Sequence, residues 1–472
     1  MNESYIQIGK RTFSLTDQLD FADLSGDNNP IHIDPLEARK TIGGACIVHG
    51  VNGFLWVLEC LVSTYNFVPK NLKIDFLKPI YVDTHVICFW SKLEKTIKIV
   101  NEEADAVVSI SYDDFIIDTS HLGNFLLPKF FELSSPKRTS FNSLDLGTKY
   151  KSEYGGKIVK VETLFSHLSS YLGDNTVYEV SILSNIVGMQ VPGLHSLFSK
   201  LEISFIDHPG FITPFYQVTK KDERFGLIEL EYTGSNFTSK IVAFERPHYE
   251  SKKCSEIKEL IPALKNLKNK KILIIGGSRG IGAACARVSS MLGADVTLTY
   301  SVGASDAQYV CADIKSYCNR IVKTIPLDIN NPCDIESLDL NYDILCYFAS
   351  PKISQTKGDF SLQTFDKFYT FYCKSFEKIA MQFSNCGGSL IYWPSTIFLE
   401  QEVTGFNEYI LAKEIGEKVC KNLEYKTNMK IIIERLEKIQ TDQTLSVMRQ
   451  PLLDAVSVSI NIANLMSFHA NE

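Results

Sequence analysis

Two residues able to exchange protons stand close together near the start of the chain. In the stretch "LSGDNNPIHID", Asp27 and His32 lie five residues apart, separated by asparagines and a proline. Proline restricts its own backbone and that of the preceding residue, so this segment can hold a carboxylate and an imidazole at a fixed separation. The segment is either a polar surface turn or an acid/base pair, and its surroundings must decide.

A second set of chemical groups lies in "WPSTIFLEQEVTGFNEYILAKEIG". Tyr409 and Lys413 are four residues apart on an expected helix and so share one face. A lysine ammonium lowers the pKa of a neighbouring phenol, which can then exchange a proton with a carbonyl or an alcohol. The hydroxyl of Ser395 could hold the same oxygen.

A glycine-rich loop precedes this set, in "KKILIIGGSRGIGAACARVSSMLGADVTLTYS". Gly276, Gly280 and Gly282 stand between an expected strand and an expected helix, where they let the backbone and the helix N-terminus approach a pyrophosphate. The next strand ends without an acidic residue for a ribose 2′-hydroxyl, whereas Arg279 could meet a 2′-phosphate. We therefore expect NADP(H) rather than NAD(H), although Arg279 could also be a solvated loop charge.

The elements that must position these groups fall into three blocks. Residues 1–120 combine an apolar helix, "GGACIVHGVNGFLWVLECLV", with alternating runs typical of a half-buried antiparallel sheet. Residues 150–247 repeat this order less clearly. Residues 270–472 alternate strands and helices, which predicts a doubly wound parallel sheet. The polar stretches at 121–149 and 248–269 are expected linkers.

Composition narrows the class of protein. The chain has 472 residues, too many for one core, so about two or three domains are expected. A net charge of -7 argues against a nucleic-acid or anionic-membrane surface. The 12 cysteines show no zinc-ligand spacing, so we expect reduced thiols and no metal site. We find neither a signal peptide nor a membrane-spanning run, which favours a cytoplasmic protein.

The C-terminal block resembles the short-chain dehydrogenase/reductase family over residues 270–472, through "GGSRGIG" and the Ser, Tyr and Lys already named. The resemblance implies an α/β Rossmann domain in which Ser395, Tyr409 and Lys413 are catalytic. It implies that the cofactor is bound by Gly276, Ser278, Arg279, Gly280, Ile281, Gly282, Asp328 (an adenine contact, in "PLDIN") and Ala349.

Several features depart from that family's pattern. "YFAS" stands where the family has NNAG, Tyr372 occupies the position of an active-site asparagine, and "IIIERLEKIQTDQT" replaces a proline–glycine pair. The spacing from Ser395 to Tyr409 is also one residue longer than the family's, so Thr396 is the alternative hydroxyl. These departures concern the proton relay and the substrate loop more than cofactor binding.

The stretch "FADLSGDNNPIHIDPLEARKTIGGACIVHGV" resembles the MaoC-like, (R)-specific enoyl-thioester hydratase family. The resemblance implies a hot dog fold, a small antiparallel sheet around a central helix, in which Asp27 and His32 provide the acid and base for hydration. The N–H of Gly50 at the helix start would stabilise the enolate-like oxygen. We expect His49 to be structural and Asp34 to cap the next helix.

The second block has no such pair. Asp174 is followed five residues later by Glu179 rather than by histidine, and His195 is expected to be a core histidine on an apolar helix. We interpret this block as a degenerate second hot dog. The predicted architecture is therefore an α+β double hot dog followed by an α/β Rossmann domain.

The prediction is a bifunctional enzyme of lipid metabolism. It would reduce a 3-oxoacyl thioester with NADPH and dehydrate the 3-hydroxyacyl product, or hydrate the enoyl form. The substrate would be an acyl-CoA or acyl-carrier-protein thioester, and we expect a homo-oligomer that binds neither nucleic acid nor membrane. In one alternative, only the hydratase works, beside a non-catalytic nucleotide-binding domain. In another, the reductase acts on a sugar or polyketide carbonyl and the hot dog pair binds an acyl chain.

Overall fold

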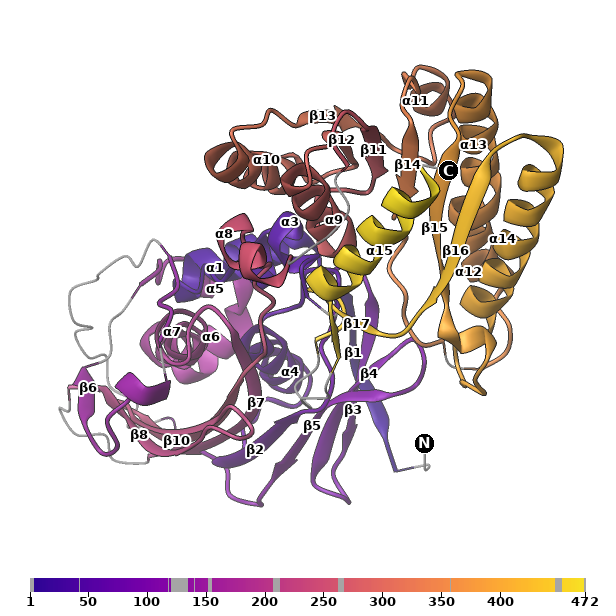
Figure 1. Ribbon diagram of the computed structural model, residues 1–472. Helices are drawn as coiled ribbons and strands as arrows, with labels where there is room; N and C mark the ends of the chain where they lie inside the picture. The colour runs from indigo at the N-terminus through magenta and orange to yellow at the C-terminus, as the bar shows by residue number, and fades with distance from the viewer. Residues whose placement is uncertain are drawn as a thin grey trace. The chain divides into compact units, whose positions relative to one another are not determined.

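The computed structural model describes residues 4–41, 43–117, 119, 135–139, 141–151, 155–206, 213–261, 267–356, 358–445 and 452–470. These residues form two compact units, the first ending at His248 and the second beginning at Tyr249 (Figure 1). Most of the predicted linker at 121–149 lies outside the described residues.

The first unit is built on one antiparallel sheet, in the order β1-β3-β4-β5-β2-β7-β10-β9-β8-β6. Counted inward from the two edges, the order is 1-3-4-5-2 in one half and 6-8-9-10-7 in the other, so the halves repeat one arrangement. Antiparallel pairing of β2 with β7 joins the halves. The strands are β1 (Ile6–Thr12), β2 (Asn71–Phe76), β3 (His85–Ser91), β4 (Thr96–Asn101), β5 (Ala106–Tyr112), β6 (Lys149–Lys151), β7 (Ser196–Phe205), β8 (Phe215–Asp222), β9 (Leu227–Thr233) and β10 (Phe237–Glu245).

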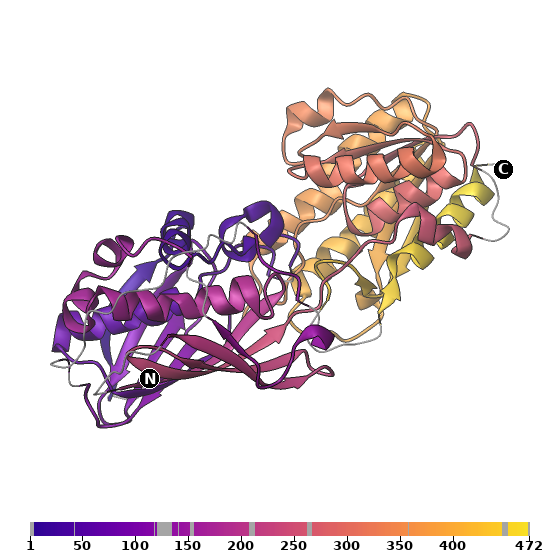
Figure 2. The same ribbon diagram turned by 90° about the vertical axis from the view of Figure 1, so that its left-hand side faces the viewer.

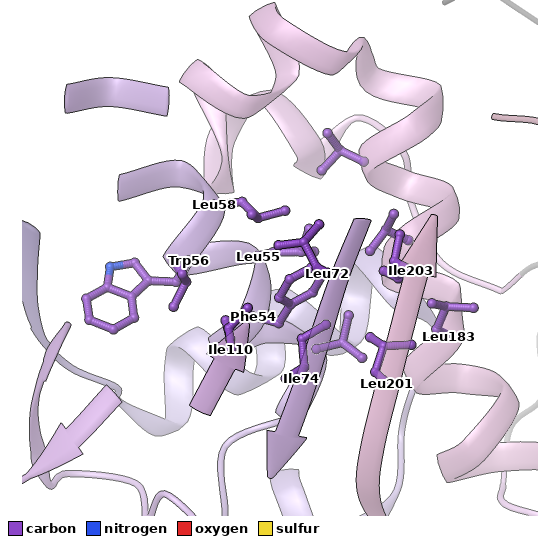
Figure 3. Close-up of a cluster of buried hydrophobic side chains, with 14 of the residues drawn as sticks. Phe54, Leu55, Trp56, Leu58, Leu72, Ile74, Ile110, Leu183, Leu201 and Ile203 are labelled. Carbon is purple, nitrogen blue, oxygen red and sulfur yellow. The ribbon is translucent and has the colours of Figure 1, made fainter. Parts of the chain in front are cut away.

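Two long helices contact each other on one face of this sheet (Figure 2). α4 (Gly50–Tyr65) is apolar around most of its circumference, which is typical of a buried helix, and it ends at Asn66 in the left-handed conformation. α7 (Asp174–Asn185) continues into a π-helical turn, Ile186–Gln190. One hydrophobic cluster spans both halves of the unit, and Figure 3 shows part of it, including Phe54, Leu55, Leu72, Ile74, Leu183, Leu201 and Ile203.

Short helices hold the segment around Asp27. Gly26 ends α1 with a φ of 71°, a conformation that glycine adopts without strain. The side chains of Asn29 and Asp34 cap α2 and α3, each of which has proline at its first position. The predicted capping role of Asp34 is confirmed. These helices are α1 (Leu15–Ser25), α2 (Pro30–Ile33), α3 (Pro35–Ala38), α5 (Lys160–Leu164) and α6 (Ser166–Leu172).

The second unit contains a parallel sheet in the order β13-β12-β11-β14-β15-β16. This is the Rossmann order 3-2-1-4-5-6, and it reverses between β11 and β14. The doubly wound parallel sheet predicted for this block is confirmed. The strands are β11 (Lys271–Ile275), β12 (Asp295–Tyr300), β13 (Lys323–Pro326), β14 (Ile344–Tyr347), β15 (Leu390–Thr396) and β16 (Lys430–Leu436), with a separate pair β17 (Ile439–Gln440) and β18 (Leu453–Asp454).

Helices cover both faces of the parallel sheet. In β11, Ile272 and Ile274 belong to one hydrophobic cluster and Leu273 and Ile275 to another, because successive strand residues point to opposite faces. α9, α10 and α15 contribute to the first cluster, and α12, α13 and α14 to the second. The helices are α8 (Cys254–Ile257), α9 (Gly280–Met291), α10 (Ala304–Cys318), α11 (Pro332–Glu336), α12 (Leu362–Tyr369), α13 (Ser375–Asn385), α14 (Asn407–Lys426) and α15 (Ala455–His469).

Part of each predicted linker packs against the unit beside it. Cys254 and Ile257, in the stretch 248–269, are fully buried in the core of the second unit. The backbone N–H of Cys254 also donates to Asp313. In the first unit, Leu146 bridges to Val218. Turn-forming composition therefore did not distinguish packed segments from free linkers.

Candidate active sites

Asp27 is a buried carboxylic acid at the junction of the two halves of the first unit. It follows the left-handed Gly26, and only 1% of its surface is exposed. Oδ2 accepts a hydrogen bond of 2.7 Å from Ser184 Oγ, and Oδ1 accepts one of 3.2 Å from the backbone N–H of Asn29. Burial raises the pKa of Asp27 to about 7, against the opposing effect of these hydrogen bonds.

His32 faces Asp27 with one nitrogen available. Its Nδ1 lies 2.8 Å from the carbonyl oxygen of Ile47, so Nδ1 carries the proton and Nε2 keeps its lone pair. Burial lowers the pKa of His32 to about 4, with the nearby charge of Arg246 acting in the same direction. The structure therefore brings Asp27 and His32 together, with one ligand atom of each within 4.8 Å of the other.

His49 packs against this pair through a stacking contact with the ring of His32. The two imidazoles stack with their centroids 3.9 Å apart, and His49 is completely buried. Its nitrogens lie 3.0 Å from Gln18 Oε1 and 3.1 Å from the carbonyl oxygen of Asp27. Asp27, His32 and His49 are clustered closely enough for a metal ion, but both nitrogens of His49 are already engaged by protein oxygens. His49 therefore has the structural role expected for it.

Gly50 begins α4 directly after His49. Backbone N–H groups in the first turn of a helix have no intrahelical acceptor and point outward. A Cβ at Gly50 would lie 3.0 Å from the ring of Phe76, so a larger residue would crowd this helix entrance. The site thus has an acid, a base and a candidate oxyanion donor next to one another.

The second half of the sheet supplies residues that sequence reasoning missed. Besides Ser184, Asn185 Nδ2 donates to the carbonyl oxygen of Gly26, and Asn29 Nδ2 donates to that of Gly188. A Cβ at Gly188 would stand 2.3 Å from Asp27 Oδ1, so only glycine fits. The sequence feature that could have indicated these residues is the set of small and polar residues in "SNIVG" at 184–188, which spans the end of α7 and the start of the π-helical turn.

The polar residues noted in the second block do not form a second acid/base site. Asp174 and Glu179 lie within α7, not in a loop equivalent to the Asp27 loop. Glu179 is completely buried, accepts hydrogen bonds from Tyr232 and Ser235, and has its pKa raised to about 7 by burial. His195 precedes β7 and is only half-buried, so the expectation of a core histidine on a helix is wrong.

In the second unit, the glycine loop has the geometry that a pyrophosphate needs. Gly276 and Gly280 have φ of 80° and 54°, and a Cβ at Gly282 would lie 2.3 Å from the carbonyl oxygen of Gly276. The backbone N–H of Ala349, on the loop after β14, borders Gly276. The loop thus leads from β11 into the N-terminus of α9 at the point where the strand order reverses.

The other predicted cofactor residues are less uniform. Ser278 and Ile281 are half-buried in the loop and in the first turn of α9. Asp328 follows β13, where its Oδ1 accepts a hydrogen bond from the N–H of Asn330. Arg279 forms an ion pair of 2.6 Å with Asp442, so it is not the solvated loop charge considered above. A 2′-phosphate would have to compete with this carboxylate.

Tyr409 lies close to Thr396, the alternative hydroxyl, rather than to Ser395. The Thr396 side chain acts to lower the pKa of Tyr409. Burial nevertheless raises the pKa of Tyr409 to about 12, so the expected lowering by Lys413 is wrong for this arrangement. Lys413 Nζ donates to the carbonyl oxygen of Pro394 at 2.7 Å, and burial lowers the pKa of Lys413 to about 7. Lys413 also lies 3.8 Å from the ring centroid of Tyr372.

Ser395 is directed elsewhere. Its hydroxyl donates to Glu417 Oε1 at 2.6 Å, and Glu417 is held by both Nε and Nη2 of Arg435. Ser395 and Thr396 are neighbours on β15, so their side chains leave opposite faces of the strand. The structure therefore does not place Ser395 beside Tyr409.

A pocket of about 490 Å³ opens near the start of α14. Residues from 355–360 and 402–408 line it, among them Glu408, which accepts hydrogen bonds from Thr356 and Ser361. Tyr409 and Lys413 do not line this pocket, so we do not assign the substrate to it.

Fold and site geometry thus define an antiparallel unit with a buried Asp–His pair, joined in one chain to a Rossmann unit with a glycine-rich loop at the strand reversal. Residues 1–109 match a family model described as "MaoC like domain". No curated protein matches the chain. None of the described helices is long and apolar enough to cross a membrane.

Solved structures of short-chain dehydrogenases are similar to part of the chain. A short-chain dehydrogenase from Burkholderia cenocepacia J2315 in complex with NADP is 22% identical, with a TM-score of 0.39, covering 43% of this chain and 92% of that one. A dehydrogenase/reductase from Sinorhizobium meliloti 1021 is 22% identical, with a TM-score of 0.38 and coverages of 42% and 88%. For L-sorbose reductase from Gluconobacter frateurii, complexed with NADPH and L-sorbose, the identity is 16%, the TM-score 0.39 and the coverages 44% and 93%.

Proposed function

We propose that the first unit is a double hot dog that adds water to a 2-enoyl thioester, and removes it in reverse, at Asp27 and His32. The observation that carries the proposal is the arrangement of these two side chains. His32 presents an unprotonated Nε2, while Asp27, with a pKa of about 7, keeps a proton in much of the protein at neutral pH.

The proposed reaction balances as follows. His32 Nε2 takes a proton from water, the resulting hydroxide adds to C3, and the double-bond electrons move onto the thioester oxygen. The N–H of Gly50 stabilises that oxygen. Asp27 then gives its proton to C2, and transfer of the proton from His32 to Asp27 restores the starting state. The pair carries one proton before and after each turnover and two while the enolate-like intermediate exists, so dehydration passes through the same states in reverse.

The test of this function is hydration of but-2-enoyl-CoA by the full chain, followed by mass spectrometry. We expect Asp27→Asn and His32→Gln each to lower kcat/KM by about 10²–10⁴-fold, the usual contribution of a positioned acid or base. Asp34→Asn, which keeps a helix-capping side chain, is the matched control and should hydrate like wild type. Equal activity of all four proteins would refute the proposal.

For the second unit, we propose NADPH-dependent reduction of a 3-oxoacyl thioester, with Tyr409 as proton donor and Thr396 holding the carbonyl oxygen. The support is the glycine loop at the strand reversal together with the proximity of the Thr396 hydroxyl to Tyr409. Gly276, Gly280 and Gly282 would hold the pyrophosphate, and the cofactor would supply the hydride. The measurement is NADPH oxidation with 3-oxobutanoyl-CoA.

A second candidate for this unit is nucleotide binding without turnover. It is favoured by Ser395, which is bonded to Glu417, and by Lys413, which is bonded to a backbone carbonyl. Saturable NADPH binding by calorimetry, with no oxidation on any 3-oxoacyl thioester, would establish this candidate over the reductase.

A further inference from the structure

Arg246 is a poorly satisfied arginine in the first unit. A guanidinium has five N–H donors, and arginine is seldom buried without a carboxylate partner. Here Nη2 has one acceptor, the carbonyl oxygen of Leu194 at 3.5 Å, and the buried Nε has no hydrogen-bond partner. Within the described part of the chain, no carboxylate forms an ion pair with Arg246, and burial lowers its pKa. The side chain therefore lacks an anion.

Arg246 lies beside the Asp27–His32 site. The carbonyl oxygen of Leu194 that accepts from Arg246 also accepts from Asn29 Nδ2 at 3.3 Å. Asn29 belongs to the same loop as Asp27 and His32, and the charge of Arg246 is close enough to lower the pKa of His32. Arg246 and His32 are each only half-buried, so a ligand at the site can reach both.

His195 extends this group of donors. The backbone N–H of Arg246 donates to the carbonyl oxygen of His195, and the ring of His195 stacks on that of His248 with centroids 4.1 Å apart. The Nδ1 of His195 is buried without a hydrogen-bond partner. Burial lowers the pKa of His195, and the positive charges of Arg246 and Arg138 act in the same direction. Such a set suits an anionic oxygen ligand.

We propose that Arg246, with His195, binds a carboxylate at the end of the acyl chain, so that the unit acts on thioesters of dicarboxylic acids. This inference rests on the proposed hydration at Asp27 and His32. The anion could in principle be a phosphate of the carrier instead. The phosphate of a pantetheine arm, however, is separated from the thioester by a long chain, whereas Arg246 shares the Leu194 carbonyl with Asn29, three residues before the reacting base His32.

The experiment compares but-2-enoyl and pent-2-enedioyl monothioesters, each on N-acetylcysteamine, which has no phosphate, and on CoA. With wild type, we expect kcat/KM for the pent-2-enedioyl thioester to exceed that for the but-2-enoyl thioester by about 10–100-fold on either carrier. Arg246→Met should remove this preference, because it lowers kcat/KM for the pent-2-enedioyl thioester about 10–100-fold more than kcat/KM for the but-2-enoyl thioester. Arg224→Met, at an exposed arginine, should change neither substrate.

Three results would overturn the proposal. Equal losses on both acyl groups would make Arg246 a general support of the site. A loss confined to the CoA thioesters would assign the anion to a phosphate. Equal kcat/KM values of wild type for the pent-2-enedioyl and but-2-enoyl thioesters would exclude recognition of a terminal carboxylate.

Binding of the saturated pentanedioyl-N-acetylcysteamine, measured by calorimetry, separates this proposal from the hydratase itself. Binding that is tighter than for the butanoyl analogue and that is weakened by Arg246→Met supports the anion site even if no thioester is hydrated. Equal binding of both analogues would remove it even if hydration is found.

Discussion

The two candidate sites hold their titratable residues in different ways. In the first unit, Asp27 and His32 come from a segment closed by Gly26 and capped helices. The hydroxyl of Ser184, on α7 in the other half of the unit, completes the carboxylate's hydrogen bonds. In the second unit, Lys413 is bonded to a backbone carbonyl, and Tyr409 has a raised pKa. A motif's spacing thus defines the face that its residues share but not the partners that they meet.

The difference comes from what surrounds each motif. The Asp27 loop is packed against the end of α7, where Asn185 holds the backbone of Gly26, and against the π-helical turn after it, where Gly188 leaves room for the carboxylate. On α14, one turn beyond Lys413, Glu417 competes for the hydroxyl of Ser395 and pairs with Arg435. The first site already holds its acid and base together. In the second site, either Ser395 must move away from Glu417 or Thr396 must take its place as the hydroxyl that holds the substrate oxygen.

The strongest test of this contrast removes each of the two neighbouring hydroxyls of β15 in turn. We expect Thr396→Val to lower the rate of NADPH oxidation with 3-oxobutanoyl-CoA by about 10²–10³-fold, as for loss of a donor at a reacting oxygen. Ser395→Ala should change the rate by less than about threefold, because Ser395 faces Glu417. The reverse ranking would show that the side chains exchange places when substrate binds.

The assembled site should be sensitive to one added methyl group. Gly188→Ala puts a Cβ against Asp27 Oδ1, so we expect a loss of about 1–3 kcal/mol in the free energy of unfolding together with reduced hydration. Gly53→Ala on α4, where a Cβ would meet Ile80 at an ordinary 3.7 Å, is the control. Urea denaturation of both variants measures the effect, and equal stabilities would show that Asp27 can move away.

The pH dependence of hydration should report the pair's single proton. The pKa of Asp27 is raised to about 7 and that of His32 is lowered to about 4. The state with Asp27 protonated and His32 neutral therefore prevails between these values. We expect kcat/KM to be level in this window and to fall about tenfold per pH unit above it, as Asp27 ionises. A rate that rises through pH 7 would instead make the Asp27 carboxylate the base.

The smallest expected effect concerns the nucleotide. Asp442→Asn keeps the size of the side chain but removes the charge that holds Arg279, so NADPH should bind about 3–10-fold more tightly. NADH, which lacks the 2′-phosphate, should bind as before. Cofactor fluorescence measures the dissociation constants of NADPH and NADH for both proteins. An equal increase in affinity for NADH would show that Arg279 does not contact the 2′-phosphate.

Much of the fold could be predicted because it depends on local patterns. The alternation of strands and helices gave the parallel sheet, and the glycines of "GGSRGIG" marked the turn into α9. The Asp27–His32 pair was also visible, since its geometry is set within one short loop. Ser184 and Arg246 were not, because each reaches the site only through tertiary packing of the second half. The choice between Ser395 and Thr396 depends on which of them meets Tyr409 and which meets Glu417, both on α14, and spacing does not reveal this.

The contribution of Ser184 and Gly188 to a carboxylate on the other half of the sheet has a consequence for how this chain can diverge. A symmetric pair of identical halves would need each copy to keep both the acid/base loop and the surface that receives it. In this chain the described residues of the second half lack the loop and keep the receiving surface. The rest of that half has no acid/base loop to preserve. Residues such as His195 and Arg246 can therefore change to suit a different ligand without loss of the catalytic pair.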